Sequence, residues 1–353
     1  MRTVLFCSAL SLILPPFASS RTDLSGGAEK IPKLMVDSTL VCKGEVIDAP
    51  DLVFSASPPS HWTATAFIRT DRCFKGEPPP GDTVPVLFDN ILPSGGTSGG
   101  TPNVILRKGD YRLYFLKPEA DKYILVDRWS GQLEISRRVA EASTHDPDPM
   151  YQLEMDLKAG LTDPDRALLM DSIRILGNMR HLQSKAELIP FLDSLDALVR
   201  TKAYQAMLRL HDYSVLPAVE QWLVAQPVPP DAVLLPWDSL FHTQYELVAE
   251  IAAIRDPAYI PTMERMLHLP KLIMRRNILD GIRAMHSPQS VPIFLDMLDD
   301  PDPDLGFVAM QGLFDLRGDG PIDWVPSFDE FRDNRAYYAT TCRQWWQANH
   351  PRE

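Results

Sequence analysis

The sequence predicts an α+β multidomain protein, in which a small antiparallel β-barrel or sandwich is followed by a solenoid of paired α-helices. Between residues 39 and 135, short runs rich in β-branched and aromatic residues alternate with glycine and proline, which is typical of strands joined by turns. From residue 163 onward, apolar residues recur every three to four positions, as they do along one face of a helix. The chain has 353 residues, enough for more than one domain with its own core.

Residues 1–20 are expected to be a secretory signal peptide. Arg2 precedes an apolar run over residues 4–14, and the small residues Ala18 and Ser20 follow it. This order is typical of a signal peptide, and the apolar run is shorter than the ~20 residues that span a bilayer. We therefore expect cleavage before Arg21, an extracytoplasmic protein that is periplasmic or secreted, and no membrane insertion.

The β-rich domain is expected over residues 21–137, and a polar linker over residues 138–162 follows it. The expected strands are residues 39–46, 63–74, 83–88, 110–116, 123–127 and 132–135. Turn residues such as Gly81 and Gly109 separate them. Several short strands at this spacing predict a small barrel or sandwich.

Three stretches of the β-rich domain carry a family resemblance. They are DSTLVCKGEV at residues 37–46, RCFKG at residues 72–76 and KGDYRLYFL at residues 108–116. Their order resembles the OB-like barrel of netrin and tissue-inhibitor-of-metalloproteinase (TIMP) modules. The resemblance implies a β-barrel, but inhibitory members of that family present a cysteine at the mature N-terminus. Here Arg21 would stand first, so we do not expect protease inhibition by that mechanism.

The mature chain would retain three cysteines, Cys42, Cys73 and Cys342. Cys42 and Cys73 lie in two expected strands of one domain, and an oxidising compartment permits a disulfide between them. The alternative is that both are small unpaired core residues. The sequence leaves the two alternatives open.

The helical half is expected over residues 163–320. Its first helix spans residues 166–177, with Asp163 as the expected N-cap and Pro164 in the first turn, the positions that these residue types favour. Further helices follow as alternating long and short segments. Each short segment begins at a proline, namely Pro190, Pro217, Pro261 and Pro292.

This alternation resembles HEAT repeats, with about five imperfect units at the ~30 to 45 residue period of helical-pair repeats. The resemblance implies a curved stack of helix pairs, in which each pair is stabilised by its neighbours. The longest interval contains an insertion at residues 226–237. Its apolar residues are candidate partner contacts, namely Val233, Leu234, Leu235 and Trp237. The alternative is that they pack onto the solenoid itself.

Residues 321–353 are expected to cap the open end of the last repeat. The segment carries Tyr337, Tyr338, Trp345 and Trp346, and solenoids need such caps for solubility. The alternative is an exposed aromatic patch that binds a partner.

The sequence contains no local motif that predicts catalysis, a cofactor or a metal site. The glycine-rich loop at residues 93–102 lacks the Lys-Ser or Lys-Thr of a P-loop. The acidic run from Asp299 to Asp304 lacks the glycine and glutamate positions of a calcium loop, so we expect a turn that caps the next helix. The formal net charge of −12 argues against nucleic acid as a partner.

These observations favour an exported protein-binding or peptide-binding scaffold without enzymatic activity or cofactor, whose helical-repeat surface takes the partner. The alternative hypothesis is an enzyme or small-ligand carrier with its pocket at the junction of the two domains.

Overall fold

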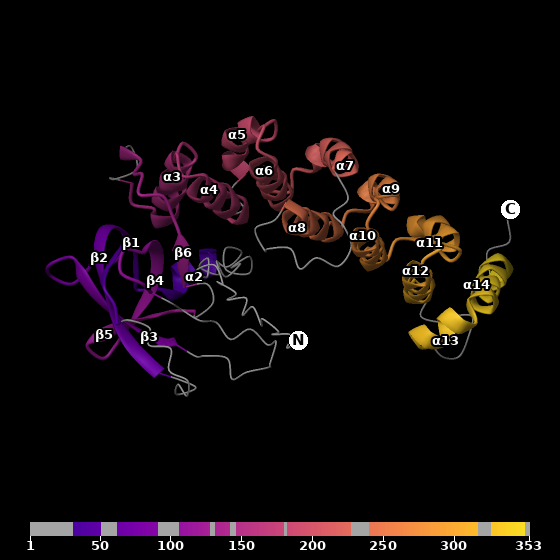
Figure 1. Cartoon of the computed structure of the whole chain (residues 1–353), viewed down its shortest axis with the longest axis horizontal. Helices are drawn as coiled ribbons and strands as arrows, with labels where there is room; N and C mark the ends of the chain where they lie inside the picture. Colours follow the sequence, from indigo (N-terminus) through magenta and orange to yellow (C-terminus); the bar gives the residue numbers. More distant parts are fainter. Residues whose placement is uncertain are drawn as a thin grey trace, which may run out of the picture.

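The computed structural model describes residues 31–50, 62–90, 106–127, 131–141, 146–179, 182–226, 240–316 and 326–349. These residues fold as an α+β protein in which a β-barrel precedes a helical solenoid (Figure 1), so the predicted fold class is confirmed. Three predicted features lie outside the described residues. They are the signal peptide at residues 1–20, the glycine-rich loop at residues 93–102, and the candidate contacts Val233, Leu234, Leu235 and Trp237.

The strands form a closed barrel with one additional strand. They are β1 (Leu40–Asp48), β2 (Trp62–Lys75), β3 (Thr83–Asn90), β4 (Tyr111–Glu119), β5 (Lys122–Leu125) and β6 (Gln132–Glu134). The order β1-β2-β3-β5-β4 closes because β4 also pairs with β1, while β6 extends β4. All described pairs are antiparallel except β3 with β5. β5 forms an antiparallel hairpin with β4 and pairs in parallel with β3. The β3–β5 pair therefore links β3 to the β4–β5 hairpin, and the β4–β1 pair completes the ring.

The barrel encloses its own apolar core and contains a disulfide. Leu40, Val46, Ile68 and Leu116 are among the side chains of this core. Cys42 and Cys73 are register partners on β1 and β2, and the structure joins them by a disulfide.

Gly44 marks a close approach of β1 and β2. A Cβ atom at Gly44 would lie 2.3 Å from the backbone oxygen of Arg69 on β2, so only glycine permits the two strands to come this near.

Two helices cover the outer face of the barrel. They are α2 (Ile31–Asp37) and α3 (Pro149–Gly160). Leu34 of α2, Leu157 of α3, and Val41 and Phe115 of the strands belong to one core cluster that continues into the solenoid. The apolar interior of the helical half therefore extends over the outside of the barrel.

The helix α3 lies within residues 138–162, which the sequence pattern indicated to be a linker. The residues that indicated a linker in fact start the helix. Pro149 stands in its first turn, and the Asp148 side chain accepts a hydrogen bond from the backbone N–H of Met150.

The solenoid consists of long helices that alternate with shorter ones. The long helices are α4 (Arg166–Asn178), α6 (Ala197–Arg209), α8 (Leu240–Ala252), α10 (Leu272–Ala284) and α12 (Pro303–Asp315). The shorter ones are α5 (Lys185–Leu188) with η3 (Ile189–Phe191), α7 (Leu216–Ala225), α9 (Ile260–Met266) and α11 (Val291–Met297). Single turns of 3₁₀ helix precede them, namely η2 (Leu182–Ser184), η4 (Tyr213–Val215), η5 (Pro257–Tyr259) and η6 (Pro288–Ser290).

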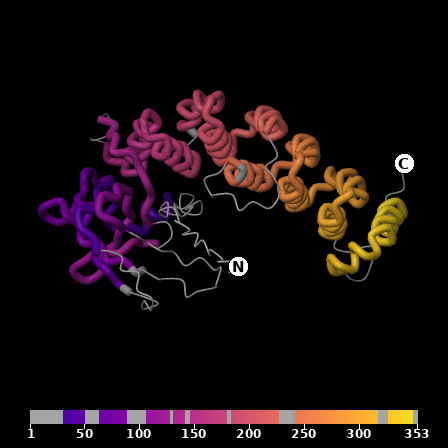
Figure 2. The backbone as a smooth tube through the Cα atoms, in the orientation of Figure 1, coloured from indigo at the N-terminus to yellow at the C-terminus, as the bar shows by residue number. Residues whose placement is uncertain are grey.

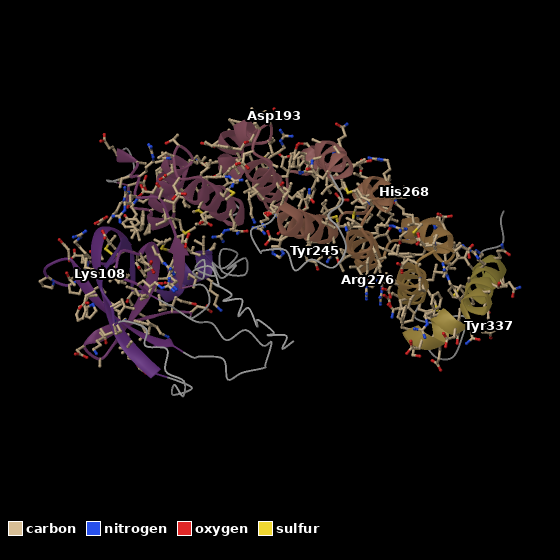
Figure 3. The ribbon with its side chains drawn as sticks, in the orientation of Figure 1. Lys108, Asp193, Tyr245, His268, Arg276 and Tyr337 are labelled. Atoms are coloured by element: carbon tan, nitrogen blue, oxygen red, sulfur yellow. A yellow bond between two sulfur atoms is a disulfide. The ribbon has the colours of Figure 1, made fainter. Side chains whose placement is uncertain are left out.

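The helices form an arch. The long helices follow its inner side and the shorter helices its outer side (Figures 1 and 2), and each long helix packs against the next. Figure 3 labels Tyr245 and Arg276 on the inner side and Asp193 on the outer side. The described helices from α4 to α12 therefore form a helical-repeat solenoid whose long helices line its inner side.

Prolines and aspartates start these helices. Pro190, Pro217, Pro261 and Pro292 stand in the first turns of η3, α7, α9 and α11, so the predicted proline starts are confirmed. Asp302 caps α12 by accepting from the backbone N–H of Asp304, which confirms the capping turn predicted for the acidic run.

The N-cap predicted for α4 is wrong by two residues. Asp165, not Asp163, accepts from the backbone N–H of Ala167. The Asp163 carboxylate instead accepts from the backbone N–H of Asp165 and from the Ser136 hydroxyl, so it holds the preceding turn.

Two helices follow the last long helix. They are α13 (Phe328–Asp333) and α14 (Arg335–Asn349), and they pack against α11 and α12. Phe331 and Tyr338 are buried there, whereas Tyr337 is 61% exposed. Among the described residues, no helix is long and apolar enough to cross a membrane.

Candidate functional site

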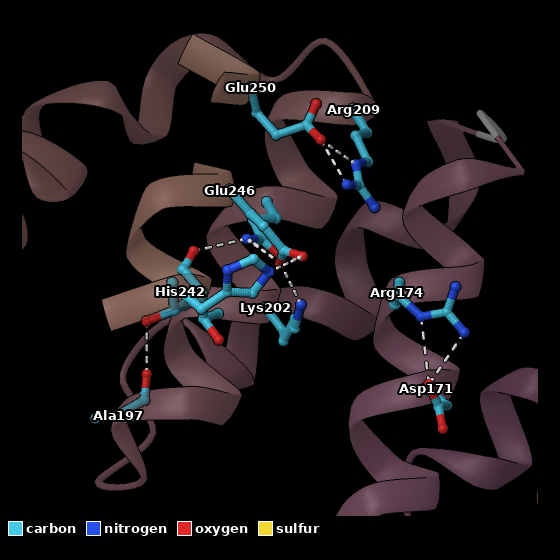
Figure 4. Close-up of polar contacts among 11 residues, drawn as sticks. Asp171, Arg174, Ala197, Lys202, Arg209, His242, Glu246 and Glu250 are labelled. Carbon is cyan, nitrogen blue, oxygen red and sulfur yellow. Dashed lines mark hydrogen bonds and ion pairs between the residues drawn. The ribbon is translucent and has the colours of Figure 1, made fainter. Parts of the chain in front are cut away.

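Charged side chains form a row across three of the long, inner helices, from α4 to α8 (Figures 1 and 4). We call it the inner polar row. It consists of Asp171 and Arg174 on α4, Lys202 and Arg209 on α6, and His242, Glu246 and Glu250 on α8.

Ion pairs join α6 to α8 within the inner polar row. The Lys202 ammonium donates to the Glu246 carboxylate at 2.7 Å, and the Arg209 guanidinium donates to the Glu250 carboxylate at 2.7 Å. The His242 ring nitrogen lies 3.4 Å from Glu246. Lys202 and Arg209 of α6 are therefore each held by an acidic side chain of the next inner helix.

Helical spacing explains why these pairs line up. Lys202 and Arg209 are two turns apart on α6, and Glu246 and Glu250 are one turn apart on α8, so each set lies on one side of its helix. Gly177 of α4 lets α6 approach closely, because a Cβ atom there would lie 2.6 Å from the Cα of Ala206. The neighbouring helices are therefore near enough for their inner side chains to meet.

A similar arrangement recurs farther along the arch. Arg283 of α10 donates to Asp315 of α12, and it also reaches Gln311 at 2.6 Å. Arg276 of α10 lies 3.8 Å from Asp304 of α12. Burial raises the pKa of Asp280, and the neighbouring guanidinium groups of Arg276 and Arg283 oppose that rise.

Several buried polar atoms between α4 and α8 have no hydrogen-bond partner. They include both amide atoms of Asn178, Nη1 of Arg174 and Oε1 of Gln205. Arg174 bonds Asp171 through Nε and Nη2, which leaves Nη1 unused. These atoms are shielded from solvent, and an unpaired buried polar atom costs about 1–3 kcal/mol.

The cysteine pair predicted from the sequence lies on other elements than the inner polar row. Cys42 and Cys73 form their disulfide between β1 and β2 of the barrel, and the inner polar row lies on the helices α4, α6 and α8. Within the described residues, no group of three or more His, Cys, Asp or Glu side chains is arranged to hold a metal ion.

The inner polar row was not predicted from the sequence. A signal existed in the seven-residue and four-residue spacings of Lys202 with Arg209 and Glu246 with Glu250. The partners, however, are more than 35 residues apart in the sequence, and each charge read alone is typical of a solvated helix face.

Comparison with known proteins gives limited similarity. No protein-family model matches the sequence, and no curated protein matches it. One solved structure that it resembles is the complex of CpcE and CpcF of phycocyanin lyase from Nostoc sp. PCC7120, at 22% identity and a TM-score of 0.29. The match covers 46% of this chain, and the chain spans 64% of the length of the matched chain.

This match corrects one expectation. Sequence analysis predicted a protein without enzymatic activity, whereas the matched complex is a lyase, and we therefore withdraw that prediction. At this TM-score the match assigns neither a reaction nor a catalytic residue to this chain. The fold and the inner polar row define the class of protein more directly: a β-barrel joined to a helical-repeat solenoid with a polar inner surface.

Proposed function

We propose that this chain is an exported protein that binds a protein or peptide partner along the inner surface of its solenoid, over α4, α6 and α8. The observation that carries the proposal is the inner polar row. Its charges on α6 and α8 are held in place by bonds between these two helices, and its charges on α4 are held by each other. Charges fixed before binding lose little conformational entropy when a partner arrives, and their pattern gives specificity.

Two narrower family assignments belong to the same proposal. We propose that the solenoid is of the HEAT type, which is supported by the alternation of long helices with short, proline-started ones. We propose that the barrel is an OB-like module of the netrin and TIMP kind. Its closed order of five strands supports an OB-like barrel, while the narrower kinship rests on the sequence resemblance.

Paired charge swaps test the binding surface. The inner swap combines Lys202→Glu with Glu246→Lys, and it keeps both the ion pair and the net charge. Its matched control on the outer side combines Glu220→Arg with Arg265→Glu, since Arg265 of α9 bonds Glu220 of α7 at 2.8 Å. The wild type and both variants would serve as baits, each without residues 1–20, in an extracytoplasmic extract of the native cells.

We expect the inner swap to lose a partner that the wild type and the outer swap retain, with equal melting temperatures. Retention of the same partner by the inner swap would contradict the proposed surface. A wild-type bait that retains no protein would contradict the proposed function itself.

Export has its own test. Mass spectrometry of the protein from its native cells should show an N-terminus at Arg21 and an extracytoplasmic location. An intact Met1 on protein from the cytoplasmic fraction would contradict export.

A further inference from the structure

We propose that the Asp156 carboxylate of α3, together with Lys43 of β1 and Arg72 of β2, acts as an orientation lock that fixes the barrel at one angle to the solenoid. The Lys43 ammonium lies 2.7 Å from one Asp156 oxygen, and the Arg72 guanidinium donates to the other at 2.9 Å. The backbone N–H of Ala140 also donates to Asp156, at 2.9 Å. One helical carboxylate therefore binds two strands and the segment that follows β6.

Further bonds tie the same groups to their surroundings. Lys43 donates to the backbone oxygen of Arg138 at 2.6 Å, and Arg72 reaches the Gln152 side chain on α3 at 3.3 Å. The Arg72 guanidinium also lies over the Phe74 ring, 5.2 Å from its centre. Each charged group is thus held by more than one contact.

The charges lie inside an apolar interface. The side chains of Lys43 and Asp156 are both 0% exposed. Val41 and Phe115 on the strands and Leu153 and Leu157 on α3 belong to the core cluster of this interface. Apolar contacts attract without direction, so on their own they permit several angles between two packed surfaces. Hydrogen bonds need defined directions, and here they select one angle.

The electrostatics indicate that this cluster provides orientation more than stability. Burial lowers the pKa of the Lys43 ammonium, even though the hydrogen bond and charge of Asp156 oppose that change. Removal from water therefore outweighs the attraction to Asp156 for this charge. Buried ion pairs of this kind are often replaced by apolar residues without loss of stability, whereas removal of one partner alone is strongly destabilising.

The test replaces all three charges by apolar residues, in the variant Lys43→Met with Arg72→Met and Asp156→Leu in the full chain. Spin labels on cysteines introduced at two exposed positions, Glu119 of β4 and Val224 of α7, report the distance between barrel and solenoid by pulsed electron paramagnetic resonance. We expect the melting temperature to stay within a few degrees of the wild type, on the scale of a volume-conserving core change. The distance distribution should become clearly wider.

The matched control removes a pair that lies within the solenoid. Lys202→Met with Glu246→Leu joins no strand to a helix, and should leave the width of the distance distribution unchanged. Equal widths in the wild type and in Lys43→Met/Arg72→Met/Asp156→Leu would overturn the orientation lock.

A second variant keeps the proposal testable if the first fails to fold. Arg72→Met removes the more exposed of the two basic partners of Asp156 and leaves the Lys43–Asp156 pair in place. We expect a folded protein with a distance distribution broader than that of the wild type, and an unchanged width would contradict the lock.

Discussion

Two lysine–carboxylate pairs in this protein have the same length and different surroundings. The nitrogen–oxygen distance is 2.7 Å for Lys43 with Asp156 and for Lys202 with Glu246. The first pair is 0% exposed on both sides, whereas the side chains of the second are 18% and 15% exposed. Distance alone therefore does not determine what an ion pair contributes, because the loss of water around each charge decides the balance.

The difference follows from where each pair lies in the architecture. Lys43 and Asp156 join two different kinds of structure, a strand and a helix, across an apolar interface. Lys202 and Glu246 join two equivalent helices of the solenoid at its inner surface. One pair therefore orients two parts of the chain relative to each other, and the other fixes charges on a surface that water reaches.

The largest expected effect comes from Asp156→Asn. The substitution keeps the shape of the side chain but leaves the buried Lys43 ammonium without its counter-charge. We expect the free energy of unfolding to fall by about 3–5 kcal/mol, as for other broken buried pairs. Urea denaturation of the two proteins measures this loss, and a loss below 1 kcal/mol would show that water reaches Lys43.

The stability of the barrel should depend on the disulfide between Cys42 and Cys73 more than the stability of the solenoid does. Cys42→Ala with Cys73→Ala opens a loop whose ends are 31 residues apart, which corresponds to about 3–4 kcal/mol in the chain-entropy model. Hydrogen exchange should then show loss of protection in β1 and β2, with little change in α10. Cys342→Ala is the control, because this buried thiol forms no disulfide. Equal loss of protection in β2 and α10 would mean that the two parts unfold as one unit.

The sequence predicted the elements better than the contacts between them. Runs rich in β-branched and aromatic residues located β1 and β2, and prolines located the starts of the short helices, because both signals act within a few residues. The helix α3 was missed because its capping aspartate and first-turn proline are also typical of a loop.

Neither charged cluster could be predicted from local signals. Lys43 alternates with apolar neighbours on β1, a pattern that indicates a solvent-facing residue in an uncovered strand. It is buried only because α3, from a distant part of the chain, covers that face of the barrel. Similarly, the inner polar row depends on how closely α4, α6 and α8 stack, which the hydrophobic period does not specify.

Glu246→Gln tests the partly exposed pair of Lys202 and Glu246. The substitution removes the charge opposite Lys202 and keeps the side chain length. We expect a loss of about 0.5–1 kcal/mol in the free energy of unfolding, since such pairs are weakened by solvent. The loss should shrink as salt is raised toward 1 M, whereas that of Asp156→Asn should not. If the loss of unfolding free energy in Glu246→Gln did not change with salt, the Lys202–Glu246 pair would be shielded from solvent like the Lys43–Asp156 pair.

The smallest expected effect concerns an ion pair at the edge of the solenoid. The Arg166 guanidinium beside Asp196 holds the pKa of that carboxyl below its ordinary value; partial burial opposes the shift, and the backbone N–H groups of Val199 and Leu198 add to it. A carboxyl whose pKa is lower in the folded state stabilises the protein above its unfolded pKa of about 3.9, and this contribution is lost as the pH falls through the folded pKa.

Asp196→Asn isolates this charge, because asparagine keeps the N-cap of α6. At pH 7 the variant should be less stable by about 0.5 kcal/mol, a small value because solvent screens the pair. The difference should shrink as the pH is lowered below about 4, where the carboxylate becomes protonated. Urea denaturation at both pH values measures it. A difference that stays constant with pH would mean that the Asp196 charge is not the source, and that its stabilising role lies in the geometry of the cap alone.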